Sequence, residues 1–431
     1  MENPSPIESP FKIAIIGGGL AGILLAIGLS SRDISVQIYE AAPTFAETSA
    51  GIGFGPNAVR AMTLLDPRIR AAYESLKTEN SWESKRNIWF DFRRGWGQIP
   101  ELLTELKMGH ESEGGGNVLR ARFMEELVKL LPVKTAEFGK NLSRVDDEGD
   151  SVRLWFQDGT QRTTDAVVGC DGIRSVVRKF LLGQDNPASQ AVFSGVYAYR
   201  GLIQMDTAID AVGEELALNS QVYVGNDGDL VTYPIEGGSL LNVVAFRKHD
   251  VDTWNHPKWI VDYPQGKLMK DFEGWGSIPL SLLKLLDKPQ AWALFEMPSI
   301  SSYSMGRITL LGDAAHGSTS HAGAGAGMAV EDALVLTNML ADPRVHLFSD
   351  IAQVFAVYSM VRHPRTQRLV RHSRESGMLF QLRKPGVEDD LRKLKEDLQN
   401  RQLWIWDINL KNHLERAKIE LSKVLNEKRK V

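Results

Sequence analysis

Three segments of this chain hold glycines and acidic residues whose types and spacing could bind a ligand, and the spacing in the first suits a phosphate-bearing one. The first is Gly17-x-Gly19-x-x-Gly22, which follows the apolar run at residues 11–16. Glycines at this spacing let a strand-to-helix turn approach a pyrophosphate, and the helix N-terminus offers N–H groups and a partial positive charge. Glu40 closes the next apolar run, where a carboxylate can accept hydrogen bonds from a ribose. The set predicts dinucleotide binding; the alternative is a glycine-rich turn followed by an exposed glutamate.

The second segment is Cys170-Asp171-Gly172, which is followed by Ser175 and Arg178. It comes directly after an apolar run, as expected for a turn at the end of a buried strand. Ser175 is suited to capping a helix that begins beside it. Taken alone, the segment predicts a strand-end turn and a capped helix.

The third segment joins Asp313, in a Gly-Asp-Ala-Ala-His run that ends at His316, to the small residues 322–327. An aspartate at a strand end can bind the hydroxyls of a polyol. Small residues let a helix N-terminus come close to a ligand, and its partial positive charge stabilises negative charge there. The alternative is a small-residue helix start that packs on a sheet.

These segments require a β-α-β frame to position them. Apolar, β-branched runs at 11–16 and 36–40 flank an apolar helical stretch at 21–31, which predicts the start of a parallel sheet. Residues 187–300 instead alternate apolar and polar residues between turn-forming sequences, which predicts an antiparallel sheet. The other predicted elements are helices at 55–78, 119–131 and 324–341 and strands within 150–170 and at 307–311.

The composition bounds the class of protein. With 431 residues, 43% of them apolar and 24% charged, the chain has enough apolar side chains to fold. Its single cysteine, Cys170, excludes a disulfide scaffold. The net charge of −4 gives no basic excess for nucleic acid or an anionic membrane. Nine histidines without ligand spacing predict no metal site.

Residues 13–29 are almost wholly apolar, as in a targeting signal or a membrane anchor. The leader before them carries Glu2 and Glu8 and only Lys12, so it lacks the basic region of a signal peptide. Five glycines interrupt the stretch, which is shorter than the roughly 20 residues of a membrane span. We therefore expect a soluble, cytoplasmic protein without a membrane span, whose residues 1–10 form a flexible tail.

In this order and spacing, the three segments resemble those of the single-component FAD-dependent aromatic hydroxylases, which include salicylate hydroxylase. The motifs are GxGxxG with Glu40, DGxxSxxR from Asp171, and GDAAH followed by GxGxG and EDA from Gly312, and the similarity covers about residues 11–410. It implies an α/β fold with a Rossmann-like (GR2-type) FAD-binding domain, an inserted, mainly antiparallel β substrate domain and a C-terminal helical segment.

The implied domain boundaries follow from these motifs. The FAD-binding domain takes residues 11–186, with some strands of the substrate domain, and residues 301–385. The substrate domain takes 187–300, and a C-terminal helix takes 386–431.

The resemblance also implies the cofactors, which are FAD and, as a transient co-substrate, NADPH or NADH. The family's contacts to the ADP half of FAD correspond to Gly17, Gly19, Gly22 and Glu40, and its contact to the ribityl chain corresponds to Asp313. Its contacts to the flavin correspond to Arg120, Gly325, Ala326 and Gly53, the last of which is expected in a loop. Asp171 and Gly172 correspond to positions that the family links to both FAD and NAD(P)H. Arg122 is the less favoured candidate for the arginine at the flavin.

The substrate side is most similar to salicylate hydroxylase relatives of fungal type, which include monooxygenases that dearomatise polyketide phenols. The resemblance implies that Arg200 and Tyr233 hold a phenol as its phenolate. A permanently charged guanidinium lowers the pKa of a phenol, and the electrophilic flavin C4a-hydroperoxide of this family requires an electron-rich ring. The alternatives are an ion pair or an edge position for Arg200 and cross-strand packing for Tyr233.

The expected function is therefore an FAD-dependent monooxygenase that uses NAD(P)H and O2 to hydroxylate a phenolic substrate, with oxidative dearomatisation favoured. The alternatives are decarboxylative hydroxylation of a salicylate, a flavin-dependent halogenase, suggested by Trp404-Ile-Trp-Asp-Ile-Asn409, and a non-catalytic FAD-fold binding protein whose charged C-terminal helix serves a partner.

Two positions depart from the family pattern. Asp33 stands where the long form of the first motif usually has glycine, and Ser320 stands where a proline is common beside the flavin. Serine adds a donor and loosens the backbone. His249, His316 and His321 are expected to be local hydrogen-bond partners.

Overall fold

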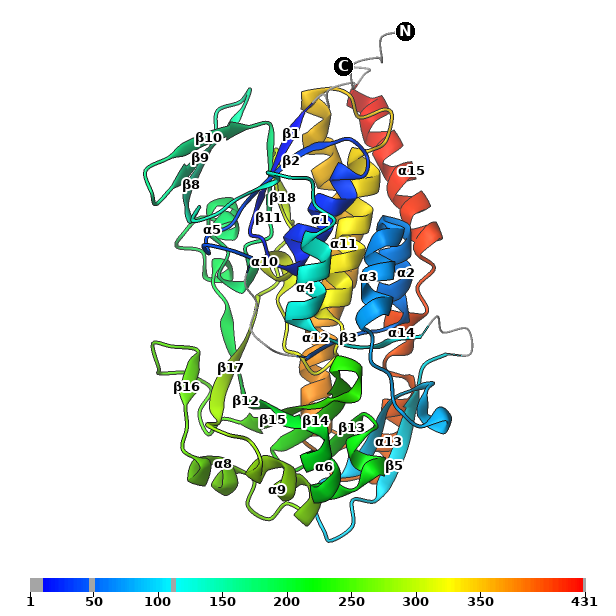
Figure 1. Ribbon diagram of the computed structural model, residues 1–431. Helices are drawn as coiled ribbons and strands as arrows, with labels where there is room; N and C mark the ends of the chain where they lie inside the picture. Colours follow the sequence, from blue (N-terminus) through cyan, green and yellow to red (C-terminus); the bar gives the residue numbers. More distant parts are fainter. Residues whose placement is uncertain (1–10, 46–50, 110–113, 429–431) are drawn as a thin grey trace.

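The computed structural model describes residues 11–45, 51–109 and 114–428 (Figure 1). The tail predicted at 1–10 lies outside the described residues. The N-terminal β-α-β unit is confirmed: β1 and β2 pair in parallel and α1 (Leu20–Ser30) connects them. They belong to a six-stranded sheet of order β18-β19-β11-β1-β2-β7, which is parallel apart from the β18–β19 pair. Its strands are β1 (Lys12–Ile16), β2 (Ser35–Tyr39), β7 (Ala136–Glu137), β11 (Ala166–Gly169), β18 (Ser304–Met305) and β19 (Ile308–Leu310).

The order of this sheet explains how the three motif segments meet. They follow β1, β11 and β19, which are neighbours in the sheet and run in the same direction. Because the carboxyl ends of parallel strands lie at one edge, segments far apart in the sequence share that edge. The predicted strand at 307–311 is thus confirmed as β19, beside β11.

Helices cover the sheet and contribute to its apolar core (Figure 1). Among them, α11 (Gly325–Leu340) is buried along most of its length and packs on α1, α2 and α12. The helices of this part are α2 (Pro56–Leu65), α3 (Pro67–Leu76), α4 (Arg120–Val128), α5 (Val176–Leu182), α10 (Asp313–His316) and α12 (Ile351–Phe380).

The helical structure predicted at 55–78 is confirmed over most of this range, where it forms two separate helices, α2 and α3. Asp66 between them is extended, with φ −159° and ψ 121°, and its side chain accepts a hydrogen bond from Arg68 N at 2.8 Å. Proline at position 67 disfavours a helical backbone at the residue before it, so the first helix ends there and Asp66 caps the second.

The second large sheet has eight strands in the order β16-β17-β12-β15-β14-β13-β4-β5. Adjacent strands in this sheet are antiparallel, except that β13 and β4 are parallel to each other. The predicted antiparallel strands of the middle region are confirmed, and β4 and β5 join them from an earlier part of the chain. Its strands are β4 (Ile88–Arg94), β5 (Leu102–Lys107), β12 (Val192–Gln204), β13 (Gln221–Gly225), β14 (Gly228–Ile235), β15 (Leu240–Lys248), β16 (Ile260–Asp262) and β17 (Gln290–Glu296).

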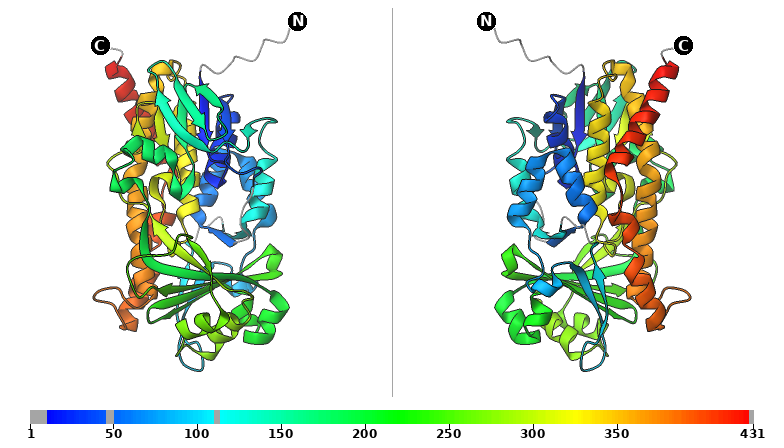
Figure 2. Two further views of the ribbon diagram at one scale, coloured as in Figure 1. Left: turned by 90° about the vertical axis from the view of Figure 1, so that its left-hand side faces the viewer. Right: turned by 90° about the vertical axis from the view of Figure 1, so that its right-hand side faces the viewer.

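One face of this sheet is covered by short helices, and the other is turned toward the six-stranded sheet (Figure 2). On the covered face, Tyr197 and Tyr199 both donate to a carboxylate oxygen of Asp271 at 2.6 Å, which attaches α8 to β12. The covering helices are α6 (Met205–Val212), α7 (Glu214–Ala217), α8 (Gln265–Asp271) and α9 (Ser277–Lys284).

The remaining strands of the described residues form two small sheets. β8 (Leu142–Asp147), β9 (Val152–Phe156) and β10 (Gln161–Thr164) form an antiparallel sheet, and β3 (Gly51–Phe54) pairs with β6 (Gly116–Leu119). Gly53, expected in a loop, lies in β3 opposite Asn117.

The C-terminal segment is helical but is not the single helix expected at 386–431. Its described part forms α13 (Leu391–Asn400), α14 (Leu403–Trp406) and α15 (Leu410–Lys428). α13 packs on β5, and α15 packs along α11 and α12 (Figure 1). Among the described residues, no helix is both long enough and apolar enough to cross a membrane.

Candidate active site

A cavity of about 430 Å³ lies between the motif edge of the six-stranded sheet and the uncovered face of the eight-stranded sheet. One wall is backbone and small side chains from the ends of β1, β11 and β19, and the other is mainly apolar and aromatic. The structure brings together nine of the residues predicted from the sequence: Gly19, Gly53, Arg120, Gly172, Arg200, Tyr233, Asp313, Gly325 and Ala326. Gly17, Gly22, Glu40 and Asp171 lie outside the cavity wall.

The glycines of the first motif have different roles. Gly17 has φ +103°, a conformation that favours glycine, and a Cβ at Gly22 would overlap the carbonyl oxygen of Gly17. Both are therefore required by the turn itself. A Cβ at Gly19 would meet no heavy atom within 4 Å, and Gly19 begins α1 without a side-chain cap. The open surface at Gly19 and the uncapped amides of α1 fit a pyrophosphate.

This difference predicts opposite behaviour for two substitutions. Gly19→Val should fold normally, since φ −73° and ψ −177° suit valine, but should weaken FAD binding roughly ten- to a hundredfold, as an overpacking cost of about 1–3 kcal/mol implies. Gly22→Ala should instead lower the melting temperature of the cofactor-free protein. Titration with FAD and thermal unfolding distinguish the two. Gly266→Ala, on α8 with open space around it, is the control, and equal FAD affinity in the Gly19 and Gly266 variants would contradict the assignment.

Glu40 is held in front of the same turn. Its two carboxylate oxygens accept hydrogen bonds from Gly18 N at 2.6 Å and from Ala42 N at 2.7 Å. Each oxygen retains a further lone pair. The carboxylate is thus fixed in place and can still accept hydrogen bonds from a ribose.

The side chains of the second segment are used within the protein. The Asp171 carboxylate accepts hydrogen bonds from Ser175 Oγ at 2.6 Å and Val176 N at 2.7 Å, and Ser175 Oγ accepts one from Arg178 N at 2.8 Å. The fully buried Arg178 donates to the carbonyl of Ala315 at 2.9 Å and so ties this turn to α10. The predicted strand-end turn with a capped helix is confirmed, and it is Gly172, not the Asp171 side chain, that lines the cavity.

The third segment presents a carboxylate and a helix N-terminus to the cavity. Asp313 is exposed at the start of α10, directly after β19. Gly325 and Ala326 form the first turn of α11, which has no side-chain cap, and the atom nearest to a Cβ at Gly325 would be Ser318 Oγ, at 3.9 Å. The uncrowded N-terminus of a 16-residue helix fits the electron-rich end of a reduced flavin.

Arg200 and Tyr233 lie on the uncovered face of the eight-stranded sheet. The Arg200 guanidinium lies 5.2 Å from the ring of Trp292, its Nε has no hydrogen-bond partner, and it forms no ion pair with any described residue. Burial lowers the pKa of Arg200 but leaves it charged at neutral pH. Burial raises the pKa of Tyr233 to about 12, although the nearby charge of Arg200 opposes this rise. The pair offers an unneutralised cation and a neutral phenol to the cavity.

A polar cluster at the cavity wall was not identified from the sequence. Asp229 Oδ1 accepts a hydrogen bond from Gln381 Nε2 at 3.0 Å and lies 3.7 Å from His321 Nε2. The His321 ring packs on Phe246, with ring centroids 4.4 Å apart. Burial raises the pKa of Asp229 to about 8 and lowers the pKa of His321 to about 3. Asp229 lies at the start of β14, opposite Phe246 of β15, where the packing of α12 on the sheet buries it.

The buried Asp229 predicts a pH-dependent stability. Between pH about 4 and 8 its carboxyl keeps a proton in the folded protein and loses it on unfolding, so the free energy of unfolding falls as pH rises, by at most about 1.4 kcal/mol per pH unit. Asp229→Asn removes this contribution. Urea unfolding at several pH values should therefore show the variant gaining stability over the wild type as pH rises. Asp227→Asn, at an exposed neighbour, should follow the wild type; a pH-independent difference for the Asp229 variant would refute the prediction.

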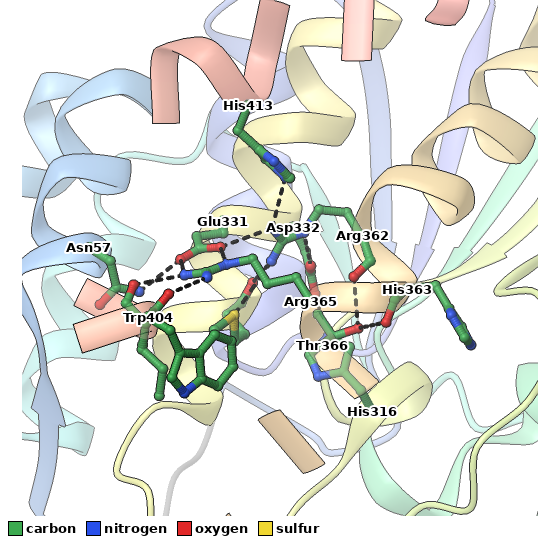
Figure 3. Close-up of polar contacts among 12 residues, drawn as sticks. Asn57, His316, Glu331, Asp332, Arg362, His363, Arg365, Thr366, Trp404 and His413 are labelled. Carbon is green, nitrogen blue, oxygen red and sulfur yellow. Dashed lines mark hydrogen bonds and ion pairs between the residues drawn. The ribbon is translucent and has the colours of Figure 1, made fainter. Parts of the chain in front are cut away.

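A buried network of ion pairs holds α11 in position (Figure 3). Arg362, on α12, pairs with Glu331 at 2.9 Å and with Asp332 at 2.7 Å, and all three side chains are fully buried. Asp332 also contacts His316 Nε2 at 2.6 Å, as expected of a local hydrogen-bond partner. Arg365 donates to Glu331 as well. The EDA motif thus fixes the helix whose N-terminus reaches the cavity.

The fold and sequence were compared with known proteins. A family described as FAD binding domain matches residues 11–199 and 286–373. The chain is 40% identical to the 6-methylsalicylate 1-monooxygenase atA of Aspergillus terreus, over 93% of this chain and 90% of that protein. It is 36% identical to a salicylate hydroxylase of Pseudomonas putida, over 95% of each chain. A solved structure of a salicylate hydroxylase substrate complex superposes with a TM-score of 0.84 at 33% identity, over 95% of this chain and 98% of that one.

Proposed function

Because this chain belongs to the FAD binding domain family and is an FAD-dependent aromatic monooxygenase related to salicylate hydroxylases, we propose that it hydroxylates a phenol bound as its phenolate by Arg200 and Tyr233. When bound, FAD supplies electrons taken from NAD(P)H and delivers one oxygen atom of O2 to the aromatic ring. The observation that carries the proposal is the Arg200 guanidinium, which forms no ion pair with a described residue and lies beside Tyr233 in an otherwise largely apolar cavity.

The cofactor is proposed to lie along the motif edge of the six-stranded sheet. The turn at Gly17, Gly19 and Gly22 would hold the ADP half, Glu40 its ribose and Asp313 the ribityl chain. Gly53, Arg120 and the start of α11 would hold the flavin. The turn at Asp171 and Gly172 would contribute its backbone. The open glycine surfaces and the uncapped helix starts support this placement.

The domain boundaries belong to the same proposal. Residues 11–186 and 301–385 would hold FAD, and residues 187–300 would bind the substrate. Residues 386–431 would form the C-terminal helical segment, whose α15 packs on α11 and α12. The proximity of β19 to β11 supports a cofactor domain made of two parts, and β4 and β5 are the substrate-sheet strands contributed by the first of them.

The chain's own residues would act on the substrate in three ways. The charge of Arg200 lowers the pKa of the phenol and so raises the fraction of the electron-rich phenolate. The Tyr233 hydroxyl, neutral at physiological pH, donates a hydrogen bond to that oxygen. The aromatic side chains beside them on the eight-stranded sheet, among them Phe90 and Phe92, exclude water from the ring and from the site of oxygen transfer.

The substrate proposed first is a salicylate, which is hydroxylated at the carbon that bears the carboxylate, with release of CO2. The Arg200 cation suits a ring with adjacent phenolate and carboxylate groups, and its burial strengthens its interaction with both anions. The similarity to relatives named for salicylate and 6-methylsalicylate supports this choice.

Oxidative dearomatisation of a polyketide-derived phenol is the second candidate. Phe90 packs edge-to-face on Tyr233, with ring centroids 6.2 Å apart. Phe92 lies two residues further along β4, so its Cα is about 6.6 Å from that of Phe90. Phe92 in turn packs on Phe380. This aromatic wall extends away from Arg200 and offers a surface for a larger alkyl substituent.

Incubation of the FAD-loaded enzyme with NAD(P)H, O2 and a panel of phenols tests the proposal. Salicylates should accelerate NAD(P)H oxidation and give, by mass spectrometry, a product that has lost CO2 and gained a hydroxyl. A product that keeps all carbons but loses its aromatic absorption favours the second candidate. A colourless protein that cannot be reconstituted with FAD, or one that oxidises NAD(P)H without modifying any phenol, would overturn both.

A further inference from the structure

The loop between α10 and α11 forms a large part of the cavity wall beside Asp313. It has no helix or strand, begins at Gly317 and includes Gly323, which has φ +61°. Gly323 N donates to Ser320 O at 2.9 Å. Such a segment loses much conformational entropy when it is held in one position. The cavity-lining residues of the loop are Ser318, Thr319, Ser320, His321, Ala322, Gly323 and Ala324.

One buried hydroxyl holds both halves of this loop. Ser373, on α12, is fully buried. Its Oγ donates to Thr319 O at 2.6 Å and accepts hydrogen bonds from Thr319 Oγ1 and Ala322 N, each at 3.1 Å. A serine hydroxyl has one donor and two acceptor positions, and all three are directed to the loop. The side chain therefore has no hydrogen-bonding capacity left for any other purpose.

The C-terminal segment holds the same loop from another direction. Gln402, which precedes α14, is 3% exposed and donates from Nε2 to Ala322 O at 3.2 Å. Since a carbonyl oxygen can only accept, this contact fixes which end of the amide faces the loop. The residue at 322 is thus bound through its N–H by Ser373 and through its C=O by Gln402.

We propose that Ser373 and Gln402 are positioning residues that keep the 317–324 loop closed against the cavity and so determine how much O2 is used productively. The proposal rests on the proposed function. In the coupled reaction of the salicylate proposed first, NAD(P)H, two H⁺, O2 and the ring C–COO⁻ give NAD(P)⁺, water, CO2 and a ring C–OH. In the uncoupled reaction, NAD(P)H, H⁺ and O2 give NAD(P)⁺ and H2O2. A loosened loop admits water and favours the second.

Two variants and two matched controls test this. Ser373→Ala and Gln402→Met remove the contacts to the loop. The control for the first is Ser376→Ala on the same helix, where Ser376 Oγ donates to His372 O and accepts from Arg401 Nε. The control for the second is Gln399→Met on α13, where Gln399 Nε2 donates to Thr104 Oγ1. We expect the first two, but not the controls, to release several-fold more H2O2 per NAD(P)H oxidised while retaining FAD. In Ser373→Ala, the Ala322 amide should exchange with deuterium about ten times faster, as expected for a lost buried hydrogen bond.

The outcomes separate this inference from the proposed function. Loop variants that match their controls in both the peroxide yield and the hydrogen exchange would overturn the positioning role. If the wild type hydroxylates no phenol, the proposed function fails, and hydrogen exchange alone then decides whether the two residues hold the loop. If Ser373→Ala does not fold, Gln402→Met and its control carry the same comparison.

Discussion

Replacing Arg200 with alanine is expected to lower kcat/KM for phenol hydroxylation by about 10²- to 10³-fold at neutral pH, while FAD remains bound. Removing one partner of a desolvated charge pair costs about 2–5 kcal/mol, and each 1.36 kcal/mol corresponds to about tenfold in rate. Arg200 forms no ion pair among the described residues, so the phenolate would be its counter-ion. The variant loses the field that stabilises the anion and must bind a neutral, less reactive phenol.

This loss should depend on pH in a defined direction. Without the guanidinium, a phenol titrates near its ordinary pKa of about 10, so activity of Arg200→Ala should rise as pH increases from 7 toward about 10, whereas the wild type should change less. Arg200→Lys keeps the charge without the planar fork and should be intermediate.

The measurements are substrate-stimulated NAD(P)H oxidation, product mass spectrometry and flavin content. Arg122→Ala is the matched control, since Arg122 is 57% exposed on α4 and pairs with Glu125. Normal hydroxylation by Arg200→Ala at neutral pH would disprove the role of Arg200 as the phenolate anchor.

Replacing Arg362 with leucine is expected to destabilise the folded protein by about 3–5 kcal/mol, because breaking a buried ion pair leaves uncompensated buried charge. The variant would leave Asp332 with His316 as its remaining side-chain partner and Glu331 with Arg365. Since these carboxylates fix α11, whose first turn lines the cavity, the variant should also lose FAD more readily. Urea unfolding and flavin release measure the two effects.

The network also makes the free energy of unfolding depend on pH in the acid range. Burial raises the pKa of Glu331, but the charges of Arg365 and Arg362 outweigh it and hold the pKa at about 2. Since the unfolded carboxyl titrates near 4.5, this contribution is present above that pH and is lost as pH falls toward about 2. Arg362→Leu should reduce this acid dependence.

Arg392→Ala supplies the comparison for the network. Its pair with Glu396 is 71% and 62% exposed, and an exposed pair contributes less than about 1 kcal/mol. Equal stability of the Arg362 and Arg392 variants would mean that the buried network does not hold α11.

The cavity shows which features need the whole fold. Asp229 lies at the start of β14 and Gln381 directly after α12, yet they form one buried contact because α12 crosses the eight-stranded sheet. The same holds for Ser373 and Gln402 at the loop. No periodicity or spacing links such residues, so they could not be recognised before the helices were in place.

The sequence by itself determined what short-range sterics and hydrogen bonding control. The glycine turn after β1, the capped turn at Asp171, the strand–loop–helix segment around Asp313 and the strands of the middle region each depend on residues a few positions apart. The break at Pro67 was also encoded locally. Only the tertiary structure decided that β4 and β5 complete the eight-stranded sheet, that Gly53 lies in a strand, and that a C-terminal glutamine contacts the cavity loop. These contacts join segments up to hundreds of residues apart, and it is the burial of apolar surface throughout the chain, rather than local conformational preference, that brings them together.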